Sequence, residues 1–285
     1  MAGCGDEDSA NGESRASSGP IGKAAGDFDP KQAMRDLRRQ VAIGPRDSGS
    51  LGGRREVRLI KRRLRAAGMG RARLQKPWRN VVARVSGAEP GIVVVGAHHD
   101  TKDGIPGFVG ANDGASGVAV LLEIARVLPR PFPGPSLVFA FFDAEEARGD
   151  RAFEKDGARG SKQFVRYALR GAGRQGSPRL DRIEAMYLLD MVGDCDLQIP
   201  REANSNPGLY RRLHGPPFGG TTAGILDDHI PFLKAGIPAV DVIDFTYGPG
   251  PTPGAWWHTP QDTLDKVCPA SLGQAGRAVI RALGG

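Results

Sequence analysis

The chain has 285 residues, of which 40% are hydrophobic, and its formal net charge is +7. This length allows one large α/β domain with a tail, and no apolar run is long enough to span a membrane. Aromatic residues do not interleave with the basic residues, which favours a solvated basic face and argues against a nucleic-acid partner.

The first 27 residues are predicted to be a disordered tail, because they are rich in Gly, Ser, Ala and charge and contain no aromatic residue. Within this tail, AGC and the polar spacer after it resemble the end of a bacterial lipoprotein signal, in which Cys4 would carry a lipid anchor. That resemblance would place the protein outside the cytoplasm, and an ordinary free cysteine is the alternative. Residues 28–285 are predicted to form the folded domain. For Cys195 and Cys268 in this domain, the sequence is compatible both with a disulfide and with two free thiols.

Secondary-structure patterns change along this domain. A helix, a loop and a second helix are predicted between residues 30 and 67, with the break at AIGPRDSGSLGG. Further on, β-branched and aromatic runs predict strands at 80–87, 91–100, 136–146, 185–193 and 238–245. Helical patterns lie between them at 115–128, 160–172 and 227–236. This alternation predicts a mostly parallel sheet with helices on both faces.

Ionisable side chains recur where the predicted strands end, and ligands of parallel sheets bind at that edge. In chain order these residues are His98, Asp100, Asp113, Glu145, Glu146, Asp190 and, near the C-terminus, His258. Imidazole and carboxylate are the ligands that zinc takes when thiolates are absent. One such strand end is common in proteins without a metal, whereas several in succession favour a catalytic metal site.

Three carboxylates are crowded into the segment FFDAEE, which ends the third long strand. Such neighbours repel one another unless a cation holds them. One of two neighbouring glutamates can anchor the cation while the other stays free to move a proton, as the glutamate of HExxH does. Asp143 is predicted to support the strand end rather than to bind metal.

The motifs GAHHDT, GANDGASGV, FFDAEE, LLDMVG, DDHIPFLKAGIP and WWHT stand in one order along the chain. With these motifs the chain resembles the zinc aminopeptidase and glutaminyl cyclase family of metallopeptidases over residues 30–283. The resemblance implies a three-layer α/β/α sandwich with a mixed, mostly parallel central sheet. It also implies that residues 28–285 are a catalytic domain acting on peptides with a free N-terminus.

The resemblance further implies the roles of the site residues. Asp113 would bridge two zinc ions, one completed by His98 and Asp190 and the other by Glu146 and His258. Asp100 would act as a catalytic residue by orienting the imidazole of His98, and Glu145 would transfer the proton.

Two activities are compatible with this ligand set. The prediction is a zinc-dependent aminopeptidase with two ions, in which Glu145 takes the proton of a metal-activated water; NDGASG favours it. The alternative is a glutaminyl-peptide cyclotransferase with one zinc, held by Asp113, Glu146 and His258. In that enzyme, Glu145 would move a proton from the substrate α-amine to departing ammonia. The segments that favour the cyclase are GFVGA, DDHIPFL and the triplet Trp257–His258–Thr259.

Three residues are candidates for the substrate pocket: Trp257, Asp228 and Asp241. Asp241 stands where animal cyclases carry a histidine, and together with Asp228 and Asp190 it could form an acidic relay. Outside the family, the alternative is a catalytically inactive metal-binding module, for which loss of a ligand would be expected, and none is lost. His99 is predicted to point away from His98 by the two-residue period of a strand, and His214 and His229 are predicted to be structural.

Overall fold

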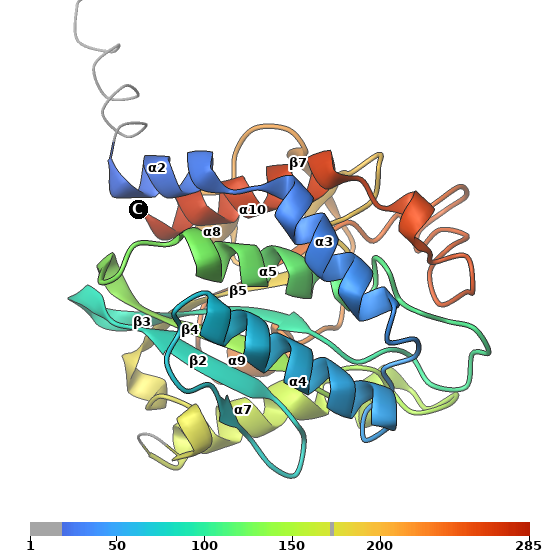
Figure 1. Cartoon of the computed structure of the whole chain (residues 1–285), viewed down its shortest axis with the longest axis horizontal. Coiled ribbons are helices and arrows are strands. Elements are labelled where there is room, and N and C mark those ends of the chain that lie inside the picture. Colours follow the sequence, from blue (N-terminus) through green and yellow to red (C-terminus); the bar gives the residue numbers. More distant parts are fainter. Residues whose placement is uncertain (1–18, 172–173) are drawn as a thin grey trace, which may run out of the picture.

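A six-stranded mixed sheet forms the centre of the computed structural model, which describes residues 19–171 and 174–285. The strand order is β1 (Arg73–Leu74), β2 (Val81–Val85), β4 (Phe132–Phe142), β3 (Gly87–His98), β5 (Ile183–Asp190) and β8 (Ala239–Ile243). Strands β4, β3, β5 and β8 are parallel, whereas β1 and β2 are antiparallel to their neighbours. The predicted mixed, mostly parallel sheet is therefore confirmed (Figure 1).

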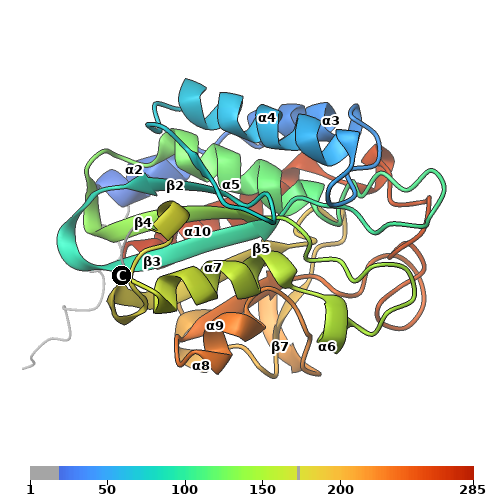
Figure 2. The same ribbon diagram turned by 90° about the horizontal axis from the view of Figure 1, so that it is seen from below.

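Helices cover both faces of this sheet (Figure 2). One face carries α2 (Pro20–Asp27), α3 (Pro30–Val41), α4 (Leu51–Ala66), α5 (Ala115–Val127) and α10 (Pro269–Leu283). The other face carries α7 (Arg159–Leu169) and α9 (Ile230–Lys234). The short helices α6 (Phe153–Asp156) and α8 (Pro207–Tyr210) lie in connecting segments. The three-layer α/β/α sandwich is thus the observed architecture.

The two hydrophobic cores follow the two-residue period of the strands. Val93 and Val95 of β3 pack in the cluster that contains α5 and α10. Ile92 and Val94 pack in the cluster that contains Phe164 of α7 and Phe232 of α9. Strands buried on both faces read as continuous apolar runs, which is why the sequence identified them so readily.

The prediction of a disordered tail was wrong for residues 20–27, which form helix α2. Ala24 and Ala25 of this helix are buried, and so is Phe28 directly after it. With Ile21, these residues follow helical spacing, so one narrow apolar face packs against α10. Within the helix, the buried residues of this face are alanines in a Gly-rich and Ser-rich context, so composition did not predict a helix here. Cys4 lies outside the described residues.

Two features were not specified by the sequence patterns. A separate two-stranded parallel sheet pairs β6 (Ile199–Glu202) with β7 (Phe218–Thr222). Cys195 and Cys268 form a disulfide, which joins the segment after β5 to the start of α10. Among the described residues, no helix is long and apolar enough to cross a membrane.

Candidate metal centre

The carboxyl ends of the parallel strands meet at one edge of the sheet, and the predicted ligands gather there. His98 and Asp190 are the last residues of the neighbouring strands β3 and β5. Asp113 lies in the loop before α5, and Glu146 follows β4 by four residues. His258 comes from the long segment between β8 and α10. Residues up to 160 positions apart in the sequence are therefore brought together by the order of the strands and by the loops that follow them.

Two three-residue sets share Asp113 at this edge. In the first, Nε2 of His98 lies 3.1 Å from Asp190 Oδ1 and 3.2 Å from Asp113 Oδ1. In the second, Nε2 of His258 lies 3.1 Å from Glu146 Oε1 and 3.4 Å from Asp113 Oδ2. Each set places its ligand atoms within 4.8 Å of one another. The geometry therefore offers two adjoining cation positions with Asp113 between them.

Asp100 connects the two halves of the centre. Its Oδ1 and Oδ2 accept hydrogen bonds from the backbone amides of Glu145 and Glu146, at 3.1 Å and 3.2 Å. The same carboxylate lies 3.7 Å from Nδ1 of His98. Asp100 therefore fixes the turn that carries both glutamates, and its orienting effect on the His98 ring stays a prediction. The hydrogen bonds to the two amides were not foreseen.

Glu145 belongs to neither set, although it is buried beside them. Burial and the nearby carboxylate of Asp227 raise the pKa of Glu145 well above its ordinary value. Burial and Asp113 raise the pKa of Glu146 to about 7. Burial disfavours the charged form of His258, but Asp113 and Glu146 raise its pKa to about 10. The carboxylate-rich centre therefore holds protons near neutral pH, and a bound cation would displace them.

Unusual backbone conformations occur at the ends of the strands in this centre. Ala144, Met191 and His258 are non-glycine residues with positive φ, at 59°, 45° and 50°. Ala144 directly precedes Glu145, and Met191 directly follows Asp190. Such conformations cost free energy and persist where the surrounding structure fixes them, often at functional sites. Here they turn the chain sharply so that strand-end side chains point into the centre.

Asp262 holds the Asp113 loop in place, and sequence reasoning missed it. Its two carboxylate oxygens accept hydrogen bonds from the amides of Asn112 and Asp113, at 2.7 Å and 3.1 Å. Tyr247 donates its hydroxyl to the same carboxylate at 2.7 Å. The available signal was Asp262 in HTPQD, four residues after His258.

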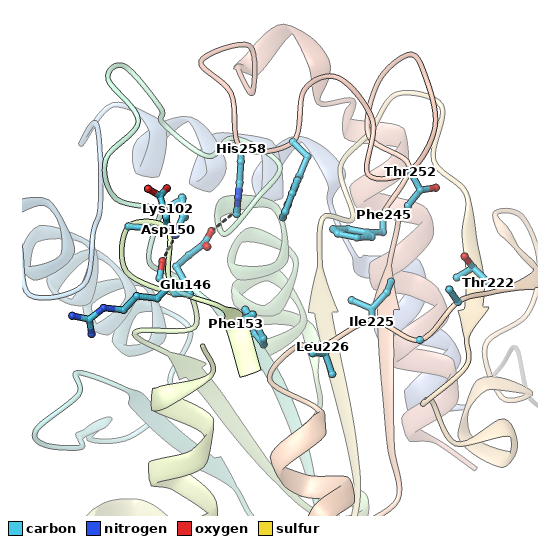
Figure 3. A pocket seen from close by; sticks show the side chains of 16 residues that line it. Lys102, Glu146, Asp150, Phe153, Thr222, Ile225, Leu226, Phe245, Thr252 and His258 are labelled. Carbon is cyan, nitrogen blue, oxygen red and sulfur yellow. Dashed lines mark hydrogen bonds and ion pairs between the residues drawn. The ribbon is translucent and has the colours of Figure 1, made fainter. Parts of the chain in front are cut away.

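A cavity of about 660 Å³ opens beside the second set (Figure 3). Glu146 and His258 lie at one end of it, and its walls are mainly apolar. Trp257 lines the cavity as predicted, stacks on the His258 ring with centroids 3.8 Å apart and contacts Phe245 edge-on. Of the five predicted ligands, only Glu146 and His258 line this cavity.

Asp228 and Asp241 do not line the cavity and are fully buried behind the centre. Asp228 accepts a hydrogen bond from Ser161 at 2.5 Å. The charges of both Asp227 and Asp228 raise the pKa of Glu145, and Asp227 also acts on the pKa of Asp241. Asp227 therefore belongs to the same buried acidic cluster, and the relay through Asp228 stays a prediction.

The remaining histidines occupy separate environments. His99 points away from His98, and its Nε2 lies 3.4 Å from the carbonyl of Arg79. His214 is exposed. His229 is fully buried between Glu202 Oε1, 3.3 Å from Nε2, and Asp241 Oδ2, 3.6 Å from Nδ1. His229 also forms a compact group with Asp227 and Asp241, whose ligand atoms lie within 4.8 Å of one another, and its structural role stays a prediction.

The residues at the centre fit zinc. The donor set is imidazole and carboxylate only, which is the chemistry of catalytic zinc sites. Asp113 Oδ2 and His98 Nδ1 are buried without a hydrogen-bond partner within the described structure. Buried polar atoms of this kind usually have a partner, and a cation between the two sets would supply one for Asp113.

Comparison with known proteins identifies the family. The family model described as "Peptidase family M28" matches residues 80–283. The chain belongs to peptidase family M28. This family includes aminopeptidases and bacterial glutaminyl cyclases and is zinc-dependent, so the resemblance seen in the motifs is confirmed.

Curated relatives include members with both names. Aminopeptidase YwaD of Bacillus subtilis is 31% identical over 207 residues, which cover 68% of this chain and 41% of that protein. The glutaminyl-peptide cyclotransferase-like protein of Mus musculus is 29% identical, with 70% of this chain and 58% of that protein covered. The chain therefore spans less than two thirds of the length of either relative.

Solved structures of the family match over nearly their whole length. The glutaminyl cyclase of an Acidobacteriales bacterium is 33% identical with a TM-score of 0.79, covering 90% of this chain and 94% of that one. The glutaminyl cyclase of Porphyromonas gingivalis is 29% identical with a TM-score of 0.76, covering 90% and 98%.

Proposed function

We propose that the protein is a zinc-dependent glutaminyl-peptide cyclotransferase, which forms N-terminal pyroglutamate on peptides. The observation that carries this proposal is the cavity, which reaches Glu146 and His258 but neither His98 nor Asp190. A substrate in the cavity would meet one cation position, the one formed by Asp113, Glu146 and His258. A single working zinc is what the cyclase alternative requires.

The comparisons support this alternative better than the predicted aminopeptidase. Bacterial glutaminyl cyclases match in both length and fold at up to 33% identity among the structures compared. By sequence, the aminopeptidase YwaD is matched over 41% of its length and the cyclotransferase-like protein of Mus musculus over 58%. The walls of the cavity also suit a cyclisation, because an intramolecular attack needs no water and apolar side chains exclude it.

Each residue of the centre has a role in this proposal. Asp113, Glu146 and His258 would hold the zinc, which when bound polarises the side-chain amide carbonyl of an N-terminal glutamine. Glu145 takes a proton from the substrate α-amine as its nitrogen bonds to the amide carbon. The bond from that carbon to the amide nitrogen breaks, and Glu145 returns the proton so that ammonia leaves. Asp100 holds the backbone of Glu145 and Glu146 in position.

One assay separates the two family activities. The purified protein, loaded with zinc, is mixed with matched peptides that begin with Gln or with Leu, and the products are followed by mass. Loss of one ammonia from an otherwise intact Gln peptide is the expected result. A peptide shortened by one residue would show an aminopeptidase instead, and the absence of both products would overturn the proposed function.

An aminopeptidase is the second candidate, and one observation favours it. The set of His98, Asp113 and Asp190 is complete, and its ligand atoms, like those of the other set, lie within 4.8 Å of one another. A second zinc there would give the two-ion arrangement of the predicted hydrolase. In that case the Leu peptide would be shortened, and the protein would bind two zinc ions for full activity.

We infer that the protein works outside the cytoplasm. The Cys195–Cys268 disulfide supports this inference, because such bonds persist in oxidising compartments. Fractionation of cells, followed by detection of the protein in the envelope or the medium, tests the location. Recovery in the cytoplasm with free thiols would contradict it.

The proposed catalytic domain begins with α2, so it includes residues 20–27 as well as 28–285.

A further inference from the structure

A buried arginine from the N-terminal helical layer reaches the loops of the metal centre. Arg46 lies between α3 and α4, in the segment GPRDSGS, and has no measurable exposure. The family match begins at residue 80, and the mechanism above gives this arginine no role. A charge buried in a folded domain is costly unless it is paired and fully hydrogen-bonded.

The guanidinium is hydrogen-bonded to backbone carbonyls near both ends of the segment 99–114, which joins β3 to α5 and contains Asp113. Nη1 donates to Val109 at 2.6 Å and Nη2 donates to Gly110 at 2.9 Å. Nε donates to the carbonyl of His99, the residue after His98, at 3.4 Å. Residues 99–114 contain no regular ladder, so their buried carbonyls need such donors.

The backbone of Arg46 is tied to the same region. Its amide donates to Thr101 Oγ1 at 2.8 Å, and that hydroxyl donates to Asp47 Oδ1 at 2.9 Å. Residues 46 and 47 are thus fixed against the segment that follows β3. The arginine side chain enters the centre from a backbone that is already anchored.

Packing around the guanidinium leaves little room for movement. A methyl group added at Gly114 would lie 3.6 Å from Arg46 Nη2 and 3.2 Å from Cε1 of His98. One added at Gly110 would lie 3.3 Å from Nη2 and 2.3 Å from the carbonyl oxygen of Asp113. The guanidinium therefore lies close to both His98 and Asp113 without contacting the ligand atoms.

From this geometry we infer that Arg46 is a positioning residue, which clamps together the two ends of the segment 99–114, next to His98 and near Asp113, and so sets the geometry of the metal centre. It acts through Gly110 and His99 and does not touch substrate. This inference rests on the proposed metal centre, and it makes the N-terminal helical layer part of the site. Removal of the clamp leaves three buried carbonyls without their donor.

The charge of Arg46 allows a sharp test, because it opposes the effect of the clamp. The acidic groups whose charges act on Arg46 are Glu56, Asp262, Asp113 and Asp100. A positive charge near a cation site weakens metal binding, so loss of the charge alone would tighten zinc binding. Loss of the clamp would weaken it. The sign of the change in zinc affinity therefore distinguishes the two effects.

The experiment compares Arg46→Met and Arg46→Lys with a matched control, Arg63→Met. Arg63 lies on α4 and pairs with Asp36 in the same helical layer, and within the described part of the chain no hydrogen bond or ion pair joins it to the segment 99–114. Zinc affinity is measured by competition with a chromophoric chelator. Arg46→Met is expected to bind zinc at least tenfold more weakly than the parent protein. Arg46→Lys, which keeps the charge, is expected to bind zinc at least as weakly as Arg46→Met, and Arg63→Met to match the parent protein.

Hydrogen exchange gives a second readout that needs no metal. The amides of Ala111, Asn112 and Asp113 are all bonded to Asp262. In zinc-free Arg46→Met they should exchange at least tenfold faster than in the parent, with β3 unchanged. If Arg46→Met fails to fold, Arg46→Lys still decides, because it keeps the charge and loses the fork.

Unchanged exchange, or zinc binding that is equal or tighter in the Arg46 variants, would overturn the inference. If the parent protein itself binds no zinc, the proposed function fails, while the exchange measurement still tests the clamp. The two outcomes can therefore be told apart.

Discussion

Glu145 and Glu146 are consecutive residues with different surroundings. Glu146 Oε1 lies 3.1 Å from His258 Nε2, whereas Glu145 stays outside both ligand sets and its Oε2 lies 3.9 Å from His98 Nδ1. The turn at Ala144, with its positive φ, and the two hydrogen bonds to Asp100 produce this division. The sequence supports the same division of roles, because adjacent carboxylates cannot both bind one ion in the same way.

Replacement of Glu145 tests that division. Glu145→Gln should keep its zinc and lose about 10²- to 10⁴-fold in kcat, the usual contribution of a positioned acid or base. Zinc content and steady-state rates are measured together. Glu184→Gln, a change at an exposed carboxylate of β5, is the control and should have the parent rate. A near-normal rate in Glu145→Gln would remove the residue from the mechanism.

Two adjacent tryptophans provide a comparison for the cavity. Trp257 lines it and stacks on His258, whereas Trp256 packs edge-on against Tyr247 and lies outside it. Trp257→Phe should raise KM about tenfold, equivalent to about 1.4 kcal/mol of binding, because the wall beside the metal recedes. Trp256→Phe should leave KM near the parent value. Equal effects of both changes would mean that Trp257 is only a core residue.

At the scale of elements, the strand ends of the centre depend on close packing by α5. A methyl group added at Gly117 of α5 would lie 2.1 Å from the carbonyl oxygen of Leu189. Leu189 directly precedes Asp190 on β5. The helix can approach the sheet at this point only because residue 117 has no side chain, so the position of Asp190 depends on it.

Gly117→Ala should therefore destabilise the fold by about 1–3 kcal/mol, the usual cost of overpacking. Urea unfolding measures the change. Gly26→Ala is the matched control, since that glycine is also helical and has nothing within 4 Å of an added methyl group. The control should be neutral or slightly stabilising, because alanine favours helix. If Gly117→Ala left the free energy of unfolding unchanged, β5 would be able to move away from the added methyl group without destabilising the fold.

The elements that the sequence predicted were those with long apolar runs or regular periods. Strands β3, β4 and β5 are buried on both faces, and α5 is apolar almost all round. Helix α2 was not predicted because its buried residues are alanines, and β7 was not predicted because FGGTT is short and rich in glycine. His98 and Asp190 were predictable because they end strands, and Asp113 and Glu146 because they lie close to a predicted helix start and strand end, whereas His258 was assigned from the WWHT motif. Asp262, Asp227 and Arg46 lie in loops, where contacts are decided only by tertiary packing.

For the molecule as a whole, the metal should contribute to stability. A ligand that binds only the folded state stabilises it by about 2.7 kcal/mol when present at 100 times its dissociation constant. Exhaustive chelation should therefore lower Tm and abolish activity, and zinc should restore both. Asp113→Asn, which alters the ligand shared by both sets, should have a low Tm that does not respond to zinc. Full activity after chelation would exclude the metal mechanism.

The Cys195–Cys268 disulfide closes a covalent ring, because the two cysteines are 73 positions apart. The ring contains β6, β7, α9, β8 and the His258 segment, so it carries DDH and one end of the cavity. A protease that cuts an exposed loop within the ring cannot release a piece of the chain. Under oxidising conditions a nicked molecule would therefore run as one species, and a reductant would separate it into two. In an environment rich in proteases, the bond would keep the part of the active site that lies on long loops attached to its sheet.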